Sequence, residues 1–238
     1  HGRNPGWEEW VWGRAEIREL LGREDGRLSR LGMPNFTGFF FTLKPWVKQT
    51  DIIRYVLLFL FGGLFMDLDV DCNRPVGPLL ARAPMVLRRS CKNNFMASVA
   101  GGEMWPAVLR MMFEMRNVSR IPATHHTGEK IICAVVDEQV GPRHKGCFHS
   151  EGARCQLRKG EWQSQVAFVG QETVGEFHGG AAPPPASHVC SHRRFGSWQQ
   201  RHKGPPECPG VYAGGALYGR ALLDRALELP AAAPGRPG

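Results

Sequence analysis

Two aspartates separated by one residue, Asp67 and Asp69, are the side chains whose types and spacing indicate chemistry most directly. Apolar and acidic residues alternate from 64 to 71, which predicts a strand with both carboxylates on one side and their Cα atoms roughly 6.5–7 Å apart. Carboxylates that close repel each other unless a cation lies beside them. Hard divalent cations bind such carboxylates together with substrate phosphates. The pair therefore predicts a metal site that neutralises a departing diphosphate.

A D-x-D triplet alone has several other interpretations. An EF-hand calcium loop beginning at Asp67 requires Gly at its sixth position and Glu at its twelfth. This chain has Cys72 and Pro78 there, which excludes that loop. A phosphatase with an aspartyl nucleophile has Thr or Val two residues after its D-x-D, where this chain has Asp71, so it stays a weaker alternative. A solvated acidic strand end is the interpretation that involves no function.

The surrounding pattern predicts the elements that must position these acids. Apolar residues recur at helical spacing in 7–32 and 48–60, and Gly62-Gly63 predicts the end of the second helix because glycine tolerates left-handed backbone. We also predict strands at 85–87 and 165–169, the latter as the only clear strand in 141–188, and helices at 106–116, 127–136 (with Thr127 as N-cap) and 216–229. A helix, a glycine turn and a strand ending in acids predict a mixed α/β sheet, in which ligands bind beyond the carboxyl ends of strands.

The composition predicts one main globular domain. The chain has 238 residues, of which 42% are hydrophobic, and a net charge of +8. A basic surface suits an anionic ligand, nucleic acid or a membrane face, but no RNA- or DNA-binding motif is recognisable, so we expect no nucleic-acid partner. The longest apolar run, 56–66, is too short to span a bilayer. Because the chain begins at His1 and not at Met, we expect it to be part of a longer protein.

The seven cysteines include no CxxC pair and no zinc-finger spacing. Four of them, from Cys147 to Cys208, cluster in a stretch rich in Pro and Gly. This cluster fits disulfides in an oxidising lumen, although the odd total leaves one cysteine unpaired.

Longer motifs around the aspartates resemble a known family. The segments 51–55 (DIIRY) and 62–70 (GGLFMDLDV) are similar to the D-x-x-R-Y helix, the G-G-[IL]-[YF] turn and the D-x-D strand of the glycosyltransferase family 32 type. That group is related to Och-type mannosyltransferases, inositolphosphoceramide mannosyltransferases and α-1,4-galactosyl- and N-acetylglucosaminyltransferases. The segment 93–98 (NNFMAS) resembles the family's N-[ND]-F-M segment, and 192–198 (HRRFGSW) resembles its H-x4-S-W motif. Thr127-Gly128 resembles its T-G-P segment, with Glu129 in place of the proline.

The resemblance implies a GT-A type (Rossmann-like) mixed sheet flanked by helices. It implies a glycosyltransferase domain over 1–204 that lacks the family's first strand, upstream of His1, and a C-terminal extension over 205–238 with a low-complexity tail. The implied reaction moves a hexose from a nucleoside diphosphate sugar to a hydroxyl on a glycan or glycolipid, with Mn²⁺ or Mg²⁺ and with retention. The implied location of the parent protein is the Golgi or secretory lumen, with a membrane anchor as one option.

The resemblance also implies residue roles. Asp69 is the first expected metal ligand, Asp67 contacts the ribose or reaches the metal through water, and His192 completes the metal site. Asp51 and Arg54 lie three apart on one helix face, where they can pair, and are expected to shape the donor-sugar pocket as catalytic residues. A structural ion pair beneath the sheet is the alternative for these two, as is core packing for Tyr55. The expected donor-binding residues are Tyr55, Gly63, Asn93, Asn94, Gly128, Ser197 and Trp198.

Two other function classes remain open at this stage. One is a non-catalytic relative that binds sugar or a partner without turnover, which Glu129 and the missing first strand favour. The intact D-x-D argues against it, and metal-dependent donor hydrolysis separates the two. A basic nucleic-acid binder is the more distant alternative, which salt-sensitive DNA binding without donor binding would support.

Overall fold

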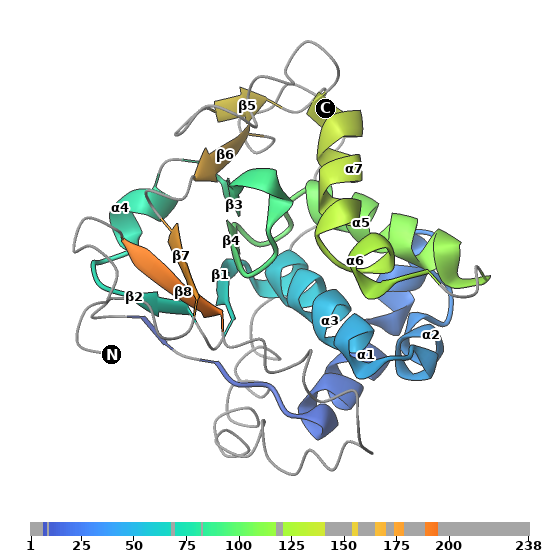
Figure 1. Ribbon diagram of the computed structural model, residues 1–238. Helices are drawn as coiled ribbons and strands as arrows, with labels where there is room; N and C mark the ends of the chain where they lie inside the picture. The colour runs from blue at the N-terminus through green and yellow to red at the C-terminus, as the bar shows by residue number, and fades with distance from the viewer. Residues whose placement is uncertain are drawn as a thin grey trace.

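The computed structural model (Figure 1) describes residues 7–8, 10–67, 70–81, 83–117, 121–140, 154–156, 165–169, 174–178 and 189–194. Its helices are α1 (Arg14–Arg30), α2 (Phe36–Thr42), α3 (Trp46–Phe61), α4 (Gly77–Leu80), α5 (Met104–Glu114), α6 (Ala123–His126) and α7 (Glu129–Val140), with 3₁₀ turns η1 (Arg89–Cys91) and η2 (Met115–Asn117). Its strands are β1 (Gly63–Met66), β2 (Val70–Cys72), β3 (Met85–Arg88), β4 (Phe95–Ser98), β5 (Arg154–Gln156), β6 (Gln165–Val169), β7 (Val174–His178) and β8 (Cys190–Arg194).

The strands form two sheets. The larger has the order β1-β4-β3-β6-β5, and only its β3–β6 pair is parallel. The smaller has the order β2-β8-β7, with β2 antiparallel and β7 parallel to β8. The larger sheet is therefore mixed, which confirms the predicted α/β class. The second sheet was not predicted.

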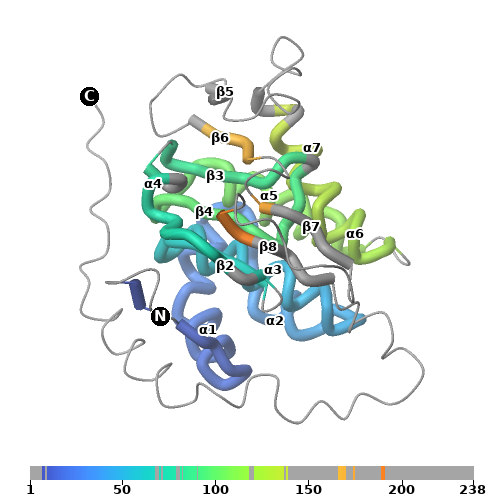
Figure 2. The backbone as a smooth tube through the Cα atoms, turned by 60° about the vertical axis from the view of Figure 1, so that its left-hand side comes forward, coloured from blue at the N-terminus to red at the C-terminus, as the bar shows by residue number. Residues whose placement is uncertain are grey.

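The two faces of the larger sheet have different covers, as the opposite pointing of successive strand residues requires. Met85, Leu87, Met96 and Phe168 face the helices, in one large apolar core with α1, α2, α3, α5 and α7. Val86, Ala97 and Val169 face the other way and pack with Val76 after β2, Val174 of β7 and Cys190 of β8. Figures 1 and 2 show the same separation, with most helices on one side of the strands and the β2-β8-β7 sheet on the other.

Helix α3 is the central element of this arrangement. Ten of its sixteen residues are buried, including the polar side chains of Lys48, Gln49, Asp51 and Arg54. A helix that is buried on most of its sides contacts protein all round, and α3 packs on α2, α5, α6, β1 and β4. Its predicted position is confirmed. Because polar groups inside a protein need partners, the buried Asp51 and Arg54 of α3 are expected to belong to a network of hydrogen bonds and ion pairs.

The Gly62-Gly63 pair is required by the junction between α3 and β1. Both residues have left-handed backbone, with φ of 68° and 92°. A Cβ on Gly62 would lie 2.5 Å from the backbone nitrogen of Ala100 and 2.8 Å from the carbonyl oxygen of Ser98. Only glycine allows this close approach of the end of α3 to the end of β4, so the glycine pair is required where α3 passes into β1.

Several predicted elements need correction. The helix predicted over 7–32 begins only at Arg14, and α2 and β4 were not predicted. The strand predicted over 64–71 is not continuous. It ends at Met66, a turn follows in which the Val70 N–H donates to the Asp67 carbonyl at 2.9 Å, and the chain resumes as β2 in the other sheet. The D-x-D triplet therefore connects two sheets.

The C-terminal half adds further corrections. Thr127 is not the N-cap of the following helix, because it ends α6 and its side chain turns inward, while α7 begins at Glu129. Strands β5 and β7 accompany the predicted 165–169 strand, which was expected to be the only clear one there. The helix predicted at 216–229 and the 205–238 extension lie outside the described residues.

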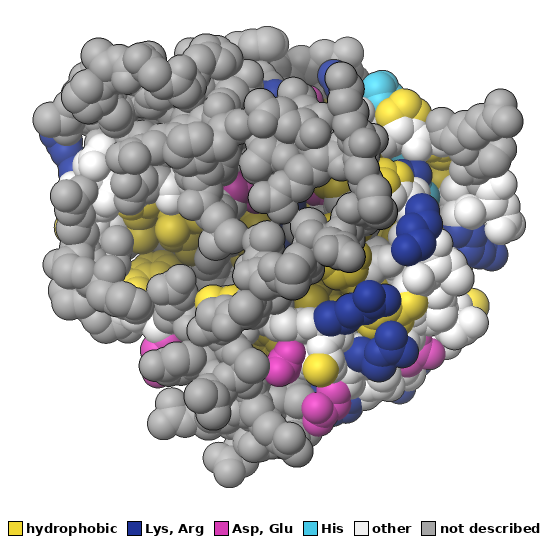
Figure 3. Space-filling view, turned by 60° about the horizontal axis from the view of Figure 1, so that its bottom comes forward, with side chains coloured by type: hydrophobic (Ala, Val, Ile, Leu, Met, Phe, Trp, Pro, Cys, Tyr) yellow, Lys and Arg dark blue, Asp and Glu magenta, His cyan; other side chains and the backbone are white. Residues whose placement is uncertain are grey.

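On the face in Figure 3, most of the visible Lys and Arg side chains of the described residues lie in the right half, and several Asp and Glu side chains lie along the lower edge. Within the described part of the chain, none of the helices is both long and apolar enough to cross a membrane.

Candidate active site

Arg54 is the centre of the polar network that surrounds the predicted site. Its Nη1 donates to the Asp67 carboxylate at 3.1 Å and to the Asn93 carbonyl at 2.8 Å. Its Nη2 lies 3.4 Å from Oδ1 of Asp51. A planar guanidinium offers several donors in a fixed geometry. One side chain of α3 therefore joins three motif segments that are up to about forty residues apart in the sequence.

Phe65 of β1 supports the guanidinium from one side. The Arg54 Cζ lies 4.5 Å from the centre of the Phe65 ring. Such cation–π contacts are worth about 0.5–2 kcal/mol, depending on how far the cation is desolvated. Phe65 is the second residue after the Gly62-Gly63 pair, so the turn that begins β1 also helps to place this ring.

Asp51 forms the buried end of the network. Its Oδ1 also accepts from the Asn93 side-chain amide at 3.0 Å, and its Oδ2 accepts from the Thr127 hydroxyl at 2.9 Å. Burial raises the pKa of Asp51, and the Arg54 charge and the Thr127 hydrogen bond act in the opposite direction. The carboxylate therefore holds Arg54, Asn93 and Thr127 in fixed relative positions. The predicted pairing of Asp51 with Arg54 is confirmed as a contact.

Tyr55 extends the network into the core. Its ring stacks on Trp105 of α5, with the ring centres 5.7 Å apart, and is fully buried. Its hydroxyl donates to the Thr127 carbonyl at 2.9 Å and accepts from the Asn93 amide at 3.1 Å. Burial raises the pKa of this phenol, so the hydroxyl stays a donor. This burial matches the core-packing alternative, and the predicted donor contact of Tyr55 stays a prediction.

The contacts of Thr127 and Gly128 explain why these two residue types follow each other in the T-G segment. The Thr127 hydroxyl is committed to Asp51, although the sequence suggested a helix cap. A Cβ on Gly128 would lie 2.9 Å from the Cα of Thr124, which requires glycine at the junction of α6 and α7. Thr127 is thus a residue of the site that was not predicted from the sequence, and its place in the T-G segment that resembles the family motif was the available signal.

The segment 92–94 connects the buried network to the D-x-D triplet. The Asp67 backbone N–H donates to the Asn94 carbonyl at 3.0 Å. The Asn94 side chain accepts from the buried Arg88 at 3.3 Å. Asn93 and Asn94 therefore lie beside Asp67, and their predicted contact with the donor sugar stays a prediction. Gly63, another predicted donor-binding residue, lies at the start of β1 with open space where a Cβ would be.

Asp67 forms the open end of the network. Its side chain is 33% exposed, whereas those of Arg54 and Asp51 are 6% and 8% exposed. The carboxylate is thus held by Arg54 and still in contact with solvent. An exposed carboxylate of fixed orientation is suited to bind a cation or a hydroxyl-bearing ligand.

Strand β8 brings a second motif to the same place. The register pairs Val70 with His192, Asp71 with Ser191 and Cys72 with Cys190. The backbone of His192 therefore lies opposite the residue that follows Asp69, although more than a hundred positions separate them in the sequence. The side chain of His192, and Asp69, Ser197 and Trp198 entirely, lie outside what the structure describes.

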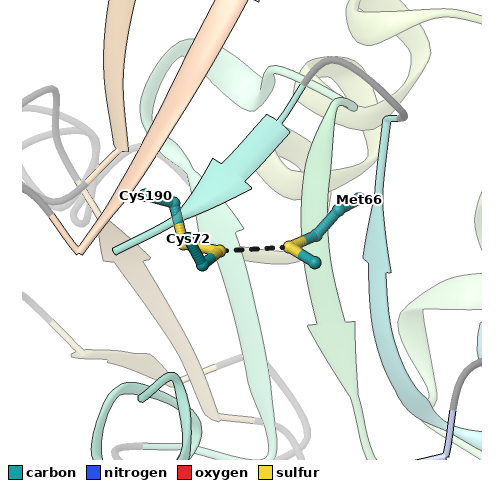
Figure 4. Close-up of a disulfide and its surroundings, with 3 residues drawn as sticks. All are labelled: Met66, Cys72 and Cys190. Atoms are coloured by element: carbon teal, nitrogen blue, oxygen red, sulfur yellow. Dashed lines mark hydrogen bonds between the residues drawn. A yellow bond between two sulfur atoms is a disulfide. The ribbon is translucent and has the colours of Figure 1, made fainter. Parts of the chain in front are cut away.

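A disulfide holds this register. Cys72 and Cys190 are bonded to each other at the paired position of β2 and β8. Figure 4 shows that the Cys72 sulfur also lies against the Met66 sulfur, at 3.4 Å. A bonded disulfide sulfur carries no hydrogen, so this is a packing contact. It links the strand before the D-x-D triplet to the strand after it.

A second disulfide joins Cys91 to Cys133. The cysteine cluster at 147–208 therefore contributes one partner, Cys190, to the two bonds found in the described residues. Across those same residues, no three His, Cys, Asp or Glu side chains lie close enough together to hold a metal ion.

The comparisons with known proteins first give the class of this region. Residues 28–86 match the family described as glycosyltransferase sugar-binding region containing DXD motif. The match includes α3, the glycine turn, β1 and Asp67-Leu68-Asp69. It confirms the resemblance to D-x-D glycosyltransferases predicted from the sequence.

Two yeast proteins are among the relatives that match part of this chain. The chain is 29% identical over 126 residues to inositol phosphoceramide mannosyltransferase 3 of Schizosaccharomyces pombe, across 52% of this chain and 32% of that protein. It is 39% identical over 70 residues to mannosyl phosphorylinositol ceramide synthase SUR1 of Saccharomyces cerevisiae, across 28% of this chain and 18% of that protein. The matches thus span a third or less of these relatives.

Among solved structures, the PaToxG glycosyltransferase matches with a TM-score of 0.36 and 15% identity, over 40% of this chain and 36% of that one.

Proposed function

We propose that this chain is the donor-binding part of a metal-dependent glycosyltransferase that moves a hexose from a nucleoside diphosphate sugar to a hydroxyl acceptor. The observation that carries the proposal is the convergence on Arg54. The D-x-x-R-Y helix, the D-x-D triplet and the N-N-F-M segment, three separate motifs, meet at one guanidinium. If Arg54 had only a packing role, there would be no need for it to orient the partly exposed carboxylate of Asp67.

The residues fit a divalent metal. Asp67 offers an exposed carboxylate, Asp69 follows it after one residue, and the β2–β8 register brings the His192 backbone alongside. Carboxylate oxygens with one imidazole suit Mn²⁺, and Mg²⁺ is the next choice. The bound metal would neutralise charge on the departing diphosphate. Ser197 and Trp198, which follow β8 in sequence, are proposed to donate to the same diphosphate.

The protein's own groups supply the remaining parts of the proposed site. Arg54 fixes the orientation of the Asp67 carboxylate, and Asp51 fixes Arg54. Asn93 is held by Asp51 and Tyr55. On the resemblance, we propose that Asn93 and Asn94, with Gly63 and Gly128, contact the donor sugar. Groups that are already held in position need little reorganisation when charge develops in the transition state, and this is the main source of electrostatic catalysis. We propose a GT-A type fold and a retaining reaction on the resemblance alone.

The donor and acceptor are proposed by class. Mannose is the first candidate for the sugar because the names of the yeast relatives are those of mannosyltransferases, and a glycolipid is the first candidate for the acceptor because those names include ceramide. Disulfides persist in oxidising compartments. The bonds Cys72–Cys190 and Cys91–Cys133 therefore support a secretory or Golgi lumen as the location.

The test is metal-dependent turnover of the donor. The chain would be incubated with GDP-mannose, UDP-galactose, UDP-glucose or UDP-N-acetylglucosamine, with Mn²⁺ or with a chelator, and release of the nucleoside diphosphate measured. We expect release from one donor that requires the metal and is lost in Asp69→Asn. Because a transferase without acceptor hydrolyses its donor slowly, long incubations are needed.

The second candidate is a non-catalytic sugar- or partner-binding relative. Glu129 at the position of the family's proline favours it. Metal-dependent donor binding without any release of nucleoside diphosphate, in a chain whose fold is verified by circular dichroism, would support this candidate and remove the catalytic proposal.

A further inference from the structure

The segment that carries Asn93 and Asn94 forms a turn between η1 and β4, and it contacts both ends of the Arg54 network. The Asn93 carbonyl accepts from Arg54, its side chain bonds Asp51, and the Asn94 carbonyl accepts from the Asp67 N–H. A displacement of this segment would therefore disturb Asp51 and Arg54 through Asn93, and would reach the D-x-D triplet through the single backbone bond at Asp67.

Two contacts attach this segment to helix α7. Cys91 is bonded to Cys133, and Lys92 pairs with Glu129 at 2.8 Å. Glu129 and Cys133 are four residues apart on α7, so they lie on the same helix face. We call Cys91, Lys92, Glu129 and Cys133 the α7 clamp. It joins two consecutive residues of the segment to two consecutive turns of the helix.

The backbone of the segment requires such support. Cys91 has a φ of 53°, in the left-handed region that residues other than glycine seldom adopt. Conformations of this kind persist where the surrounding structure determines them. The bond to Cys133 and the ion pair at the next residue supply that determination immediately before Asn93.

The ion pair also explains why a glutamate is suited to position 129. It stands where the T-G-P motif has proline, directly after Thr127 and Gly128, and its carboxylate reaches across to Lys92. The same junction thus holds Asp51 through the Thr127 hydroxyl and holds the Asn93 segment through Glu129. The departure from the family motif coincides with a cross-link that proline could not make.

We propose that the α7 clamp is a positioning device for the sugar end of the donor site. This rests on the proposed function. The clamp sets the position of Asn93, which the proposed function places beside the donor sugar, whereas the nucleotide and metal end is held mainly by β1, β2 and β8. Its loss therefore weakens binding of the complete nucleotide sugar more than binding of the free nucleoside diphosphate.

The principal test is the double variant Cys91→Ser/Cys133→Ser in the full chain. Hydrogen exchange of the Asp67 and 93–94 amides, measured without ligand, reports the position of the segment independently of donor binding. Calorimetric titrations with Mn²⁺ then compare the nucleotide sugar turned over by the parent chain with its nucleoside diphosphate. We expect faster exchange and a loss in nucleotide-sugar affinity of about threefold to thirtyfold, the range for residues that act without touching a ligand.

The ion pair gives a smaller and milder test. Both side chains are partly exposed, so Glu129→Gln should weaken nucleotide-sugar binding by about fivefold at most. The exchanged pair Lys92→Glu/Glu129→Lys should restore part of that affinity, which a general loss of stability would not do. Glu24→Gln is the matched control, since it removes an acid paired with Arg23 and Arg27 on α1 without contact to the site.

The outcomes separate the two proposals. Faster exchange with a selective loss of nucleotide-sugar affinity supports the clamp. Unchanged exchange of the Asp67 and 93–94 amides in the folded double variant overturns it, and so does an equal loss for nucleotide sugar and free nucleotide. If the parent chain binds no nucleotide at all, the proposed function fails, while the exchange data still decide whether the clamp holds the segment.

Discussion

The two ends of the Arg54 network differ in what their carboxylates can do. At the buried end, Asp51 is 8% exposed and accepts from Asn93, Thr127 and Arg54. At the open end, Asp67 is 33% exposed and is oriented by the same guanidinium. The residue types and the cationic partner are the same at both ends, so exposure and the number of buried partners make the difference.

This difference separates a structural role, for Asp51, from a ligand-binding role, for Asp67. A buried carboxylate whose oxygens already accept from three side chains stabilises the positions of those side chains. A partly exposed carboxylate of fixed orientation is available to a ligand that arrives from solvent. The same D-x-x-R and D-x-D acids, which look equivalent in the sequence, therefore have different expected effects when altered, and the comparison can be tested at each end.

The largest expected effect is on stability at the buried end. Asp51→Asn leaves the Arg54 charge buried without its α3 partner, and breaking a buried ion pair costs about 3–5 kcal/mol. Asp67→Asn, the same change at the open end, should cost about 1 kcal/mol or less because the pair is partly solvated. Urea unfolding of both variants measures the difference. Equal losses at the two ends would contradict the division.

The next effect is on activity at the open end. Asp67→Asn should lower donor turnover by about 100-fold or more, the size found when one preorganised electrostatic group is removed, while the protein stays folded. Release of nucleoside diphosphate under the conditions that support the parent chain is the measurement. A variant with normal turnover would show that Asp67 is no more than a solvated strand end.

A smaller effect should come from Tyr55, which extends the buried end into the core. Tyr55→Phe removes a hydroxyl that donates to the Thr127 carbonyl and accepts from Asn93, and should lower the free energy of unfolding by about 1–1.5 kcal/mol. Because the Phe ring keeps its stacking on Trp105, the loss reports the hydrogen bonds. Chemical denaturation measures it, and a loss above that of Asp51→Asn would show that the phenol, and not the carboxylate, organises the buried end.

The smallest effect is a dependence on pH beneath the buried end. His126 accepts from the Lys48 ammonium at Nδ1, at 3.2 Å, and donates from Nε2 to the Met112 carbonyl at 3.1 Å, an arrangement that requires the neutral ring. Burial, chiefly, and the Lys48 charge lower the pKa of His126 below its ordinary value of 6.5. Below that pH the unfolded chain takes up a proton that the folded chain does not, so stability falls as the pH drops.

Unfolding experiments at pH 7.5 and 5.5 test this expectation. The parent chain should lose at most about 1.4 kcal/mol between them from this group, since pH 5.5 lies one unit below the ordinary pKa and one unit has that value. His126→Gln should lose less, whereas His125→Gln, a change at the exposed neighbouring position, should lose as much as the parent chain. The same pH dependence in both variants would mean that another group is responsible.

The sequence predicted the parts of this site that depend on local pattern. Helix α3, the Gly62-Gly63 turn, β3 and β6 follow from apolar periodicity and from the conformational freedom of glycine, and all are present. The pairing of Asp51 with Arg54 follows from their spacing on a helix. The resemblance of the D-x-D region to glycosyltransferases is confirmed by the family match over residues 28–86.

The parts that were missed depend on long-range contacts. The strand through the D-x-D triplet is interrupted at Asp67 because β1 pairs with β4, whereas β2 pairs with β8 in another sheet. Thr127 was predicted to be a helix cap from its local pattern. Its bond to Asp51 joins residues 76 positions apart, and no local pattern indicates it. The Cys91–Cys133 and Cys72–Cys190 bonds cannot be chosen from spacing among seven cysteines.

The most direct test of the account is a calorimetric titration of GDP and of UDP into the folded chain, with Mn²⁺ and with a chelator, alongside Asp67→Asn and Asp69→Asn. We expect one nucleotide to bind only with the metal, and we expect both variants to weaken this binding at least about tenfold, as loss of a charge-assisted ligand would. Binding of equal strength in the chelator, or no binding of either nucleotide, would contradict the assignment of the open end to the metal and diphosphate.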